Sequence, residues 1–195
     1  MAIKLIIGIG NPDLPAGRQV NEYQNTRHNV GFVLLEYIAK KESFNDFELN
    51  KKLNAEISKG KIDKAQVILA KPLTYVNKCD EVAIKLIKNY KLTIENLVVV
   101  HDDLEIPFGN TKLSFGKNSG GHKGVESVMK ALKTKDFYRL RIGTGKKALD
   151  NAREQSDKKR DEFVMKFVLS KFTPSEQDEL KKLFKEGYDK LLQII

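Results

Sequence analysis

The chain contains one cysteine, Cys79, and no tryptophan among its 195 residues. A single cysteine excludes an intramolecular disulfide, so nothing in the sequence requires an oxidising compartment. No apolar run approaches the roughly 20 residues that a membrane-spanning helix needs. The first residues, MAIKLIIGIGNP, hold too short an apolar run for a signal peptide and lead directly into a strand pattern. We therefore expect a cytoplasmic protein without a membrane segment.

Several common signatures of cofactor and nucleophile sites are also missing. GIGNP at residues 8–12 is not the G-x-G-x-x-G of a dinucleotide-binding loop, and GKNSGG at 116–121 is not a P-loop. No serine stands in a G-x-S-x-G turn, and neither H-E-x-x-H nor paired-cysteine spacing occurs. We expect no nucleotide cofactor, no metal and no side-chain nucleophile.

Basic residues, in contrast, are abundant. Lysine and arginine number 35 against 26 acidic residues, which gives a net charge of +9 and a pI near 9.4. Such an excess favours a polyanionic partner, and nucleic acid is the usual one. Composition cannot show clustering, so basic residues dispersed for solubility remain the alternative.

Hydrophobic periodicity predicts strands and helices that alternate along one domain, residues 1–195. We expect strands at 4–10, 53–60, 65–72, 97–103, 111–115 and 138–145, and helices at 29–41, 79–91, from the glycine-rich loop to about 133, and at 173–192. The last helix carries a capping box, with Thr173 as N-cap and Glu176 three residues on. The polar segment 146–161 has no apolar stripe and is predicted to be a flexible loop. The expected fold class is α/β, a mixed and mostly parallel sheet between helical layers in a three-layer arrangement.

Polar residues collect where the predicted strands end and the loops begin. Asn11 follows the first strand, Asn77 follows the strand at 65–72, Asp102 follows LVVV, and His122 lies in the glycine-rich loop. Sites of α/β sheets gather at such strand ends, so we expect these side chains to lie together. His28 joins them at a helix start.

His28 is the natural base of this group, because an unperturbed pKa near 6.5 leaves it mostly neutral at physiological pH. It lies between Arg27 and Asn29, polar neighbours that a core histidine would not need. A carboxylate such as Asp102 would hold the ring in one tautomer and stabilise the imidazolium. The amides of Asn11 and Asn77 could donate to a developing oxyanion. With no nucleophile in view, the base would activate water, and the predicted reaction is hydrolysis.

Simpler interpretations stay open at this point. His28 could cap or pack a helix start, and Asp102 and Asp103 could turn a strand into a loop. Asn11 before a proline is a common turn former. A metal site built from the histidines and the two aspartates is conceivable, although no ligand spacing supports it.

Five blocks, in order, resemble the bacterial peptidyl-tRNA hydrolases over nearly the whole chain. They are KLIIGIGNP, YQNTRHNVGF, KPLTYVN, VVVHDDLEIPFG with SGGHKG, and FYRLRIGTG followed by FVLSKF. The resemblance implies cleavage of the ester between a peptide and the 3′-terminal ribose of tRNA, without metal or cofactor, by a protein that is typically a monomer. It leaves one rival, an RNA-binding protein on the same fold that has lost hydrolysis.

The resemblance also implies roles for individual residues. His28 matches the catalytic base and Asp102 the carboxylate that orients it. Asn11 matches the asparagine that helps separate peptidyl-tRNA from free aminoacyl-tRNA. Asn77 matches a residue that binds substrate near the scissile ester, His122 lies in the substrate-binding glycine-rich loop, and Tyr23 and Tyr75 match positions that line the site for the acceptor end.

Basic residues beside the site would hold acceptor-stem phosphates. Arg141 matches one such position, and Lys112, Arg139, Lys146 and Lys147 are nearby candidates. Phosphate contacts give affinity with little sequence preference, which suits an enzyme that acts on many tRNAs.

The chain departs from the family pattern at several places. Lys123 replaces an asparagine that binds substrate, and Ser114 replaces a basic residue in the strand before the glycine-rich loop. The segments 13–22 and 146–161 are longer than usual. Lysine still donates hydrogen bonds but cannot accept them, so we expect Lys123 to alter substrate binding rather than chemistry.

Overall fold

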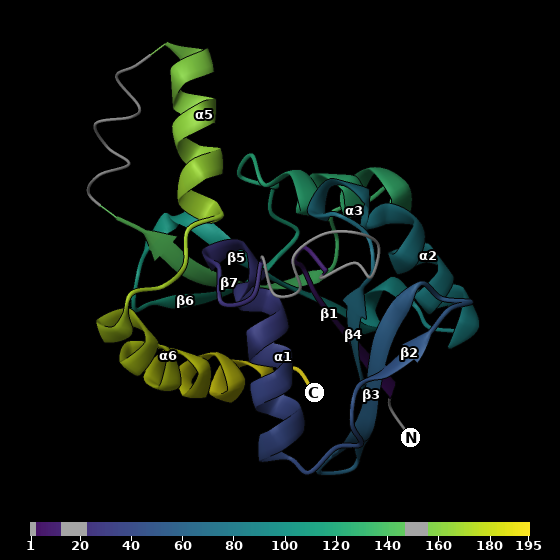
Figure 1. Ribbon diagram of the computed structural model, residues 1–195. Coiled ribbons are helices and arrows are strands. Elements are labelled where there is room, and N and C mark those ends of the chain that lie inside the picture. The colour runs from purple at the N-terminus through teal and green to yellow at the C-terminus, as the bar shows by residue number, and fades with distance from the viewer. Residues whose placement is uncertain (1–2, 13–22, 147–155) are drawn as a thin grey trace.

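A seven-stranded mixed sheet forms the centre of the computed structural model, which describes residues 3–12, 23–146 and 156–195 (Figure 1). The strands are β1 Ile3–Gly8, β2 Glu48–Asn50, β3 Ala55–Ile62, β4 Ala65–Pro72, β5 Leu97–Pro107, β6 Thr111–Phe115 and β7 Tyr138–Gly145. They lie in the order β2-β3-β4-β1-β5-β7-β6. The four neighbours β4, β1, β5 and β7 run parallel, and the outer pairings are antiparallel. The predicted α/β class with a mixed sheet is confirmed.

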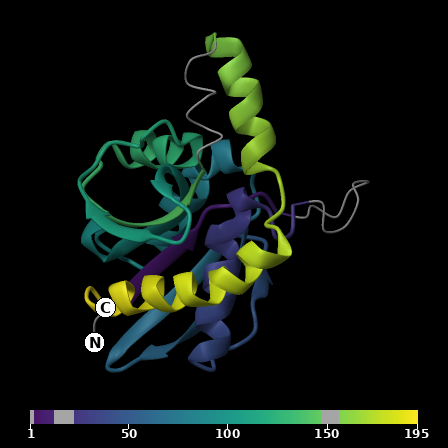
Figure 2. The same ribbon diagram turned by 90° about the vertical axis from the view of Figure 1, so that its left-hand side faces the viewer.

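Helices cover both faces of this sheet (Figures 1 and 2). They are α1 Val30–Lys41, α2 Asp80–Asn89, α3 Lys123–Leu132, α5 Asp157–Val168 and α6 Pro174–Leu192, with the short 3-10 turns η1 Arg27–Asn29, η2 Val76–Lys78 and η3 Ile94–Asn96. The two faces of β1 explain its unbroken apolar run. Leu5 and Ile7 pack with α2 and α3, whereas Ile6 packs with α1 and α6. Among the described residues, no helix has the length and apolar character to cross a membrane.

The predicted capping box of α6 is present. The Thr173 hydroxyl accepts the backbone N–H of Glu176 at 3.3 Å, and the Glu176 carboxylate accepts the N–H of Thr173 at 2.8 Å. Two donors that a helix start leaves without an internal partner are thereby satisfied.

Strand β2 was not predicted, and the bounds of other elements differ from those expected, most of all in two places. Strand β5 does not end at Asp103 but continues to Pro107, with an irregular register between those two residues. The flexible loop predicted for 146–161 is wrong over its last residues, because α5 begins at Asp157. The apolar residues of α5 come after this polar stretch, so the stretch by itself gave no helical stripe. The long segment at 13–22 lies outside the described residues.

Candidate active site

The turn η1 brings His28 against the sheet because glycine permits close contact just behind it. Gly31, in the first turn of α1, lies so near β5 and the end of β1 that a Cβ would come within 2.6 Å of the Val100 carbonyl oxygen and 2.7 Å of that of Ile9. Any side chain here would push α1 away from the sheet. The glycine therefore sets the approach of His28 to the middle of β5, where Asp102 lies.

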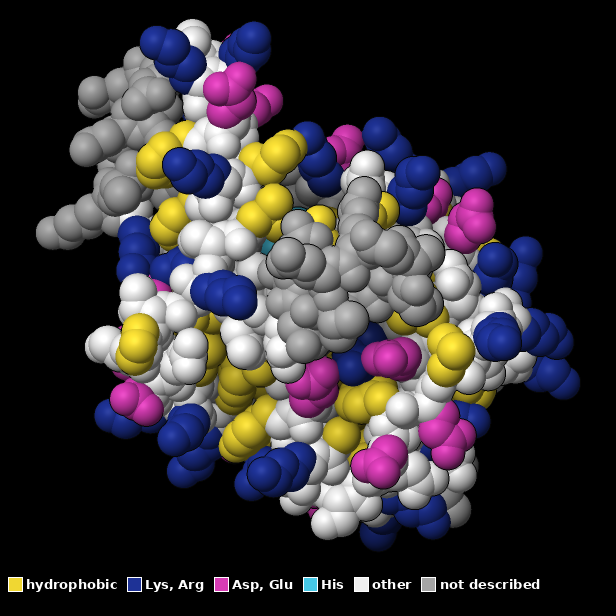
Figure 3. Space-filling model, viewed as in Figure 1, with side chains coloured by type: hydrophobic (Ala, Val, Ile, Leu, Met, Phe, Trp, Pro, Cys, Tyr) yellow, Lys and Arg dark blue, Asp and Glu magenta, His cyan; other side chains and the backbone are white. Residues whose placement is uncertain are grey.

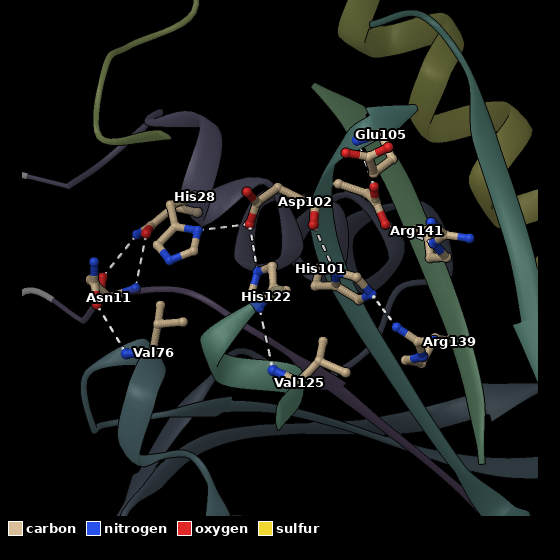
Figure 4. A network of polar contacts seen from close by, with 12 residues as sticks. Asn11, His28, Val76, His101, Asp102, Glu105, His122, Val125, Arg139 and Arg141 are labelled. Carbon is tan, nitrogen blue, oxygen red and sulfur yellow. Dashed lines mark hydrogen bonds and ion pairs between the residues drawn. The ribbon is translucent and has the colours of Figure 1, made fainter. Parts of the chain in front are cut away.

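Asp102 accepts hydrogen bonds from two histidines on one oxygen (Figure 4). The Nδ1 of His28 lies 2.8 Å from Asp102 Oδ1, and the Nε2 of His122 lies 3.0 Å from the same atom. His122 is the N-cap of α3, and its Nδ1 accepts the backbone N–H of Val125 at 3.3 Å. Its proton therefore resides on Nε2, where it donates to Asp102.

These contacts determine the charge states of the pair. Burial alone would raise the pKa of Asp102, but the rings of His28 and His122 hold it well below its usual range. Burial alone would lower the pKa of His28, but the Asp102 carboxylate raises it above its ordinary value. With Nδ1–H bound to Asp102, neutral His28 keeps its lone pair on Nε2. That nitrogen can take a proton from water.

His101 is the third histidine of the cluster, and sequence reasoning gave it no role beyond a conceivable metal ligand. It is fully buried on β5, and its Nδ1 lies 2.6 Å from the backbone oxygen of Asp102. Burial, followed by the nearby His122, lowers its pKa well below the ordinary value. Its ring packs edge-on against His122, with centroids 4.7 Å apart. His101 is thus a buried, neutral ring that packs against His122 and binds the backbone of Asp102.

Asn11 is fixed by an exchange of hydrogen bonds with Asn29, which the sequence did not single out. The N–H of Asn11 donates to Asn29 Oδ1 at 2.9 Å, and Asn29 Nδ2 donates back to the Asn11 carbonyl at 2.8 Å. The side-chain Oδ1 of Asn11 accepts the N–H of Val76 at 3.1 Å. The amide nitrogen of Asn11 is therefore the group that can donate to a substrate oxygen.

The residues expected to bind substrate lie on the surrounding turns. Asn77 is exposed on η2, next to the Val76 N–H that Asn11 binds, and Tyr75 is the N-cap of that turn. Tyr23 precedes η1, where its carbonyl accepts the hydroxyl of Thr26 at 2.8 Å. Gly124 lets α3 approach η2, since a Cβ there would meet Val76 at 2.7 Å. The glycine-rich loop and η2 are thereby held next to each other.

The basic residues of β6 and β7 divide into exposed and buried positions. Arg141 lies directly opposite Lys112, and its Nε donates to Asp103 at 2.7 Å. Arg139 is only 1% exposed and donates from Nη2 to the carbonyls of Lys117 and Asn118, both at 2.8 Å. Its Nη1 lies 3.5 Å from His101 Nε2.

Burial contradicts the phosphate contact expected of Arg139. Its guanidinium is turned to the glycine-rich loop and to His101 rather than to the surface (Figure 4). The sequence places Arg139 in a strand beside the site, but it carries no signal that a loop folds over that position. The residue instead anchors the loop that carries His122.

The remaining basic candidates are placed differently. Lys146 donates to Glu176 at 2.6 Å, and Lys147 lies outside the described residues. Lys123 is exposed at the first position of α3, directly after His122. Ser114 lies opposite Arg139, and Lys112 is exposed two residues earlier on the same side of β6.

A metal could use only one group of side chains among the described residues. His28, Asp102 and His122 offer ligand atoms within 4.8 Å of one another. These same atoms are engaged in the two hydrogen bonds to Asp102, so a metal would have to displace both ring protons. The donor set is better satisfied as a proton-transfer group than as a ligand cage.

A histidine oriented by a carboxylate on an α/β sheet is an arrangement that a hydrolase can use to activate water. The lone cysteine supplies no alternative, because burial raises the pKa of Cys79 to about 12. The chain belongs to the peptidyl-tRNA hydrolase family, whose model matches residues 5–195.

Individual relatives agree over the full length. The peptidyl-tRNA hydrolase of Aquifex aeolicus is 38% identical over 100% of this chain and 91% of the relative. That of Sulfurihydrogenibium sp. is 36% identical over 99% and 91%. The crystal structure of peptidyl-tRNA hydrolase from Acinetobacter baumannii matches with a TM-score of 0.77 at 30% identity, over 98% of this chain and 92% of that one. The activity is accordingly hydrolysis of the ester that joins a peptide to tRNA.

Proposed function

We propose that His28 is the general base of this hydrolysis and that Asp102 orients it. The hydrogen bond of 2.8 Å between His28 Nδ1 and Asp102 Oδ1 is the observation that carries the proposal. It leaves Nε2 as the proton acceptor. His28 takes a proton from water, and the resulting hydroxide attacks the ester carbonyl. The imidazolium then gives that proton to the ribose oxygen that leaves with the tRNA.

Asn11 supports the developing oxyanion in this scheme. Its backbone is bound to Asn29 and its Oδ1 to Val76, so the side-chain amide is pre-oriented before substrate arrives. A pre-oriented donor costs little reorganisation at the moment of reaction. Asn77, Tyr23 and Tyr75 contribute to the surface around the acceptor end.

Phosphates of the acceptor stem are held along β6 and β7 and at the start of α3. Arg141, Lys112 and Lys123 are the basic residues assigned to this task, and Lys112 substitutes for the missing cation at position 114. Lys112 and Arg141 lie opposite each other on adjacent strands, which suits a shared phosphate between them. We also infer that the chain acts as a monomer in the cytoplasm, where translation produces peptidyl-tRNA, and that it needs no metal.

The direct test is the release of N-acetyl-aminoacyl-tRNA by His28→Ala. We expect kcat to fall by about 10³-fold or more, within the range that general-base groups and their support contribute. Wild-type turnover by a folded variant would overturn the assignment. A parallel assay with excess chelator should leave wild-type activity unchanged; loss that Mg²⁺ or Zn²⁺ restores would indicate a metal after all.

A further inference from the structure

Arg27, the residue before His28, makes a buried ion pair with a distant helix. The residue is 3% exposed, and its Nη2 donates to both carboxylate oxygens of Glu176, at 2.7 and 2.8 Å. Glu176 is the capping-box residue of α6. Nη2 binds the carboxylate while Nη1 binds the Lys171 carbonyl, so the buried contacts restrain the orientation of the guanidinium as well as its distance from Glu176.

The junction between α5 and α6 is joined to the same turn through the backbone. The N–H of Arg27 donates to the Ser170 carbonyl at 3.1 Å, and the N–H of Phe172 donates to that of Asn25 at 3.2 Å. The Nη1 of Arg27 adds a bond to the carbonyl of Lys171 at 2.7 Å. The guanidinium carbon also lies 4.8 Å from the ring centre of Phe167. The turn before His28 and the α5–α6 junction therefore form one packed unit.

Glu176 binds residues at both ends of the segment that connects β7 to α6 and that carries α5. Its Oε1 accepts Lys146 Nζ at 2.6 Å, just after β7, and its Oε2 accepts the Thr173 N–H just before α6. Burial alone would raise the pKa of Glu176, but hydrogen bonds from Lys146 and Thr173 and the charge of Arg27 lower it to about 2. One ionised carboxylate thus joins both ends of this segment to the residue next to the base.

We propose that Arg27 and Glu176 are positioning residues, which hold the His28 ring on Asp102 by fixing η1 against the α5–α6 junction. Neither residue touches the reacting atoms. Their effect passes through the backbone of η1, whose other side is fixed by Asn29 to Asn11. The inference rests on the proposed role of His28 as base.

The reaction is sensitive to such positioning because the base must keep a defined geometry. A displacement of 1 Å at a reacting group can cost about 100-fold in rate. His28 faces Asp102 from β5 and His122 from the start of α3, with ring centroids of the two histidines 5.1 Å apart. A less restrained η1 would lengthen the hydrogen bond between His28 and Asp102. The Asp102 carboxylate would then raise the pKa of His28 less.

Glu176→Gln is the first variant to measure. Its single carbonyl oxygen cannot accept bonds from Arg27, Lys146 and Thr173 together, although the side chain keeps its shape. We expect kcat to fall about tenfold and KM to change less than threefold, since the base is displaced without loss of a substrate contact. The acid limb of the kcat–pH profile should move to lower pH as His28 loses Asp102.

Arg27→Lys is the second variant and the fallback if Glu176→Gln does not fold. Lysine keeps the charge, but its one nitrogen cannot replace both Nη2, which binds Glu176, and Nη1, which binds the Lys171 carbonyl. We therefore expect a fall of about fivefold in kcat with the same shift of the acid limb. Tyr188→Phe is the control. It removes a 2.7 Å bond from α6 to Glu42 at the far end of α1, about 18 Å along that helix from η1.

The outcomes separate this inference from the role of His28. Tyr188→Phe should lower thermal stability while leaving kcat and the acid limb unchanged. A folded Glu176→Gln or Arg27→Lys protein with kcat within threefold of wild type, or with an unmoved acid limb, overturns the positioning role. If His28→Ala is inactive at the same time, the base assignment stands and only the inference fails. If His28→Ala is active, the base assignment itself fails.

Discussion

The Asp102 cluster and the β6–β7 edge use similar polar side chains in opposite ways. Around Asp102, the carboxylate is 2% exposed, and the side chains of His28 and His122 are 16% and 9% exposed. Along the edge, Lys112 is exposed, and Arg141 is 20% exposed and pairs with Asp103. A buried carboxylate has strong electrostatic effects on the group it contacts, whereas exposed cations give affinity that salt can screen. Substitutions in the first region should therefore change kcat, and those in the second should change KM.

Asp102→Asn should give the largest effect. The asparagine amide would donate to His28 Nδ1, which places the ring proton on Nε2 and removes the base. We expect kcat to fall by about 10³–10⁴-fold with KM within a few-fold of wild type. Steady-state hydrolysis of N-acetyl-aminoacyl-tRNA measures both parameters.

Asp103→Asn is the matched control, because it is the neighbouring aspartate and pairs with Arg141 instead of a histidine. It should change KM more than kcat. If both variants keep wild-type kcat, another group orients His28, and the division between the two regions is wrong.

His122→Ala should give a smaller effect with a defined sign. Without the second ring donor, the Asp102 carboxylate acts on His28 alone, so the pKa of His28 rises further above its ordinary value. A base must be neutral to act, and wild-type kcat/KM is therefore expected to decline as pH falls through a midpoint above 6.5. The variant should move this midpoint to higher pH and lower kcat about tenfold, since the loop also loses its bond to Asp102.

The pH profile of kcat/KM and an NMR titration of the His28 ring measure that midpoint. His122→Gln, whose amide can still donate to Asp102, should stay close to wild type. A midpoint that moves to lower pH in His122→Ala would mean that the second donor does not weaken the influence of Asp102.

Lys112→Ala and Arg141→Ala test the edge. Each should raise KM by about three- to tenfold at low salt and reduce the salt dependence of binding by about one counterion, with kcat retained. Lys85→Ala, an exposed lysine on α2, serves as the control for general charge loss. A tenfold fall in kcat for Lys112→Ala would show that the edge takes part in the chemistry.

How far the sequence predicts this molecule depends on the range of the interaction. Apolar periodicity located the long strands and α1, α2, α3 and α6. The predicted strand ends pointed to Asn11 and Asp102, and a helix start pointed to His28. These signals are local. Arg139 was predicted as a candidate for phosphate contact, but the glycine-rich loop folds over it, and no local signal indicates that contact.

Arg27 and Asn29 also show that local sequence signals do not reveal long-range partners. Both flank His28, and their polar character was noticed, but their partners Glu176 and Asn11 lie 149 and 18 residues away in the chain. No spacing rule links such positions. The start of helix α5 was missed because its first residues are polar and show no apolar stripe. It projects from the body of the molecule, and on the face shown in Figure 3 its basic, acidic and hydrophobic side chains are interspersed.

Lys123→Asn should give the smallest effect, and it lies where the two regions meet. Lys123 is exposed at the first position of α3, while His122 beside it is bonded to Asp102. A cation at a helix N-terminus costs about 0.3–1 kcal/mol unless an anion is near, so the position is unfavourable for lysine in the absence of substrate. A tRNA phosphate near Lys123 would make the position favourable for lysine instead.

We expect Lys123→Asn to be slightly more stable to heat and to show a KM raised about two- to threefold at low salt, with a difference that disappears at high salt and an unchanged kcat. Lys130→Asn, on the exposed side of the same helix, controls for loss of charge. Identical KM and salt dependence in Lys123→Asn and wild type would remove Lys123 from the binding edge and leave Lys112 and Arg141 as its cations.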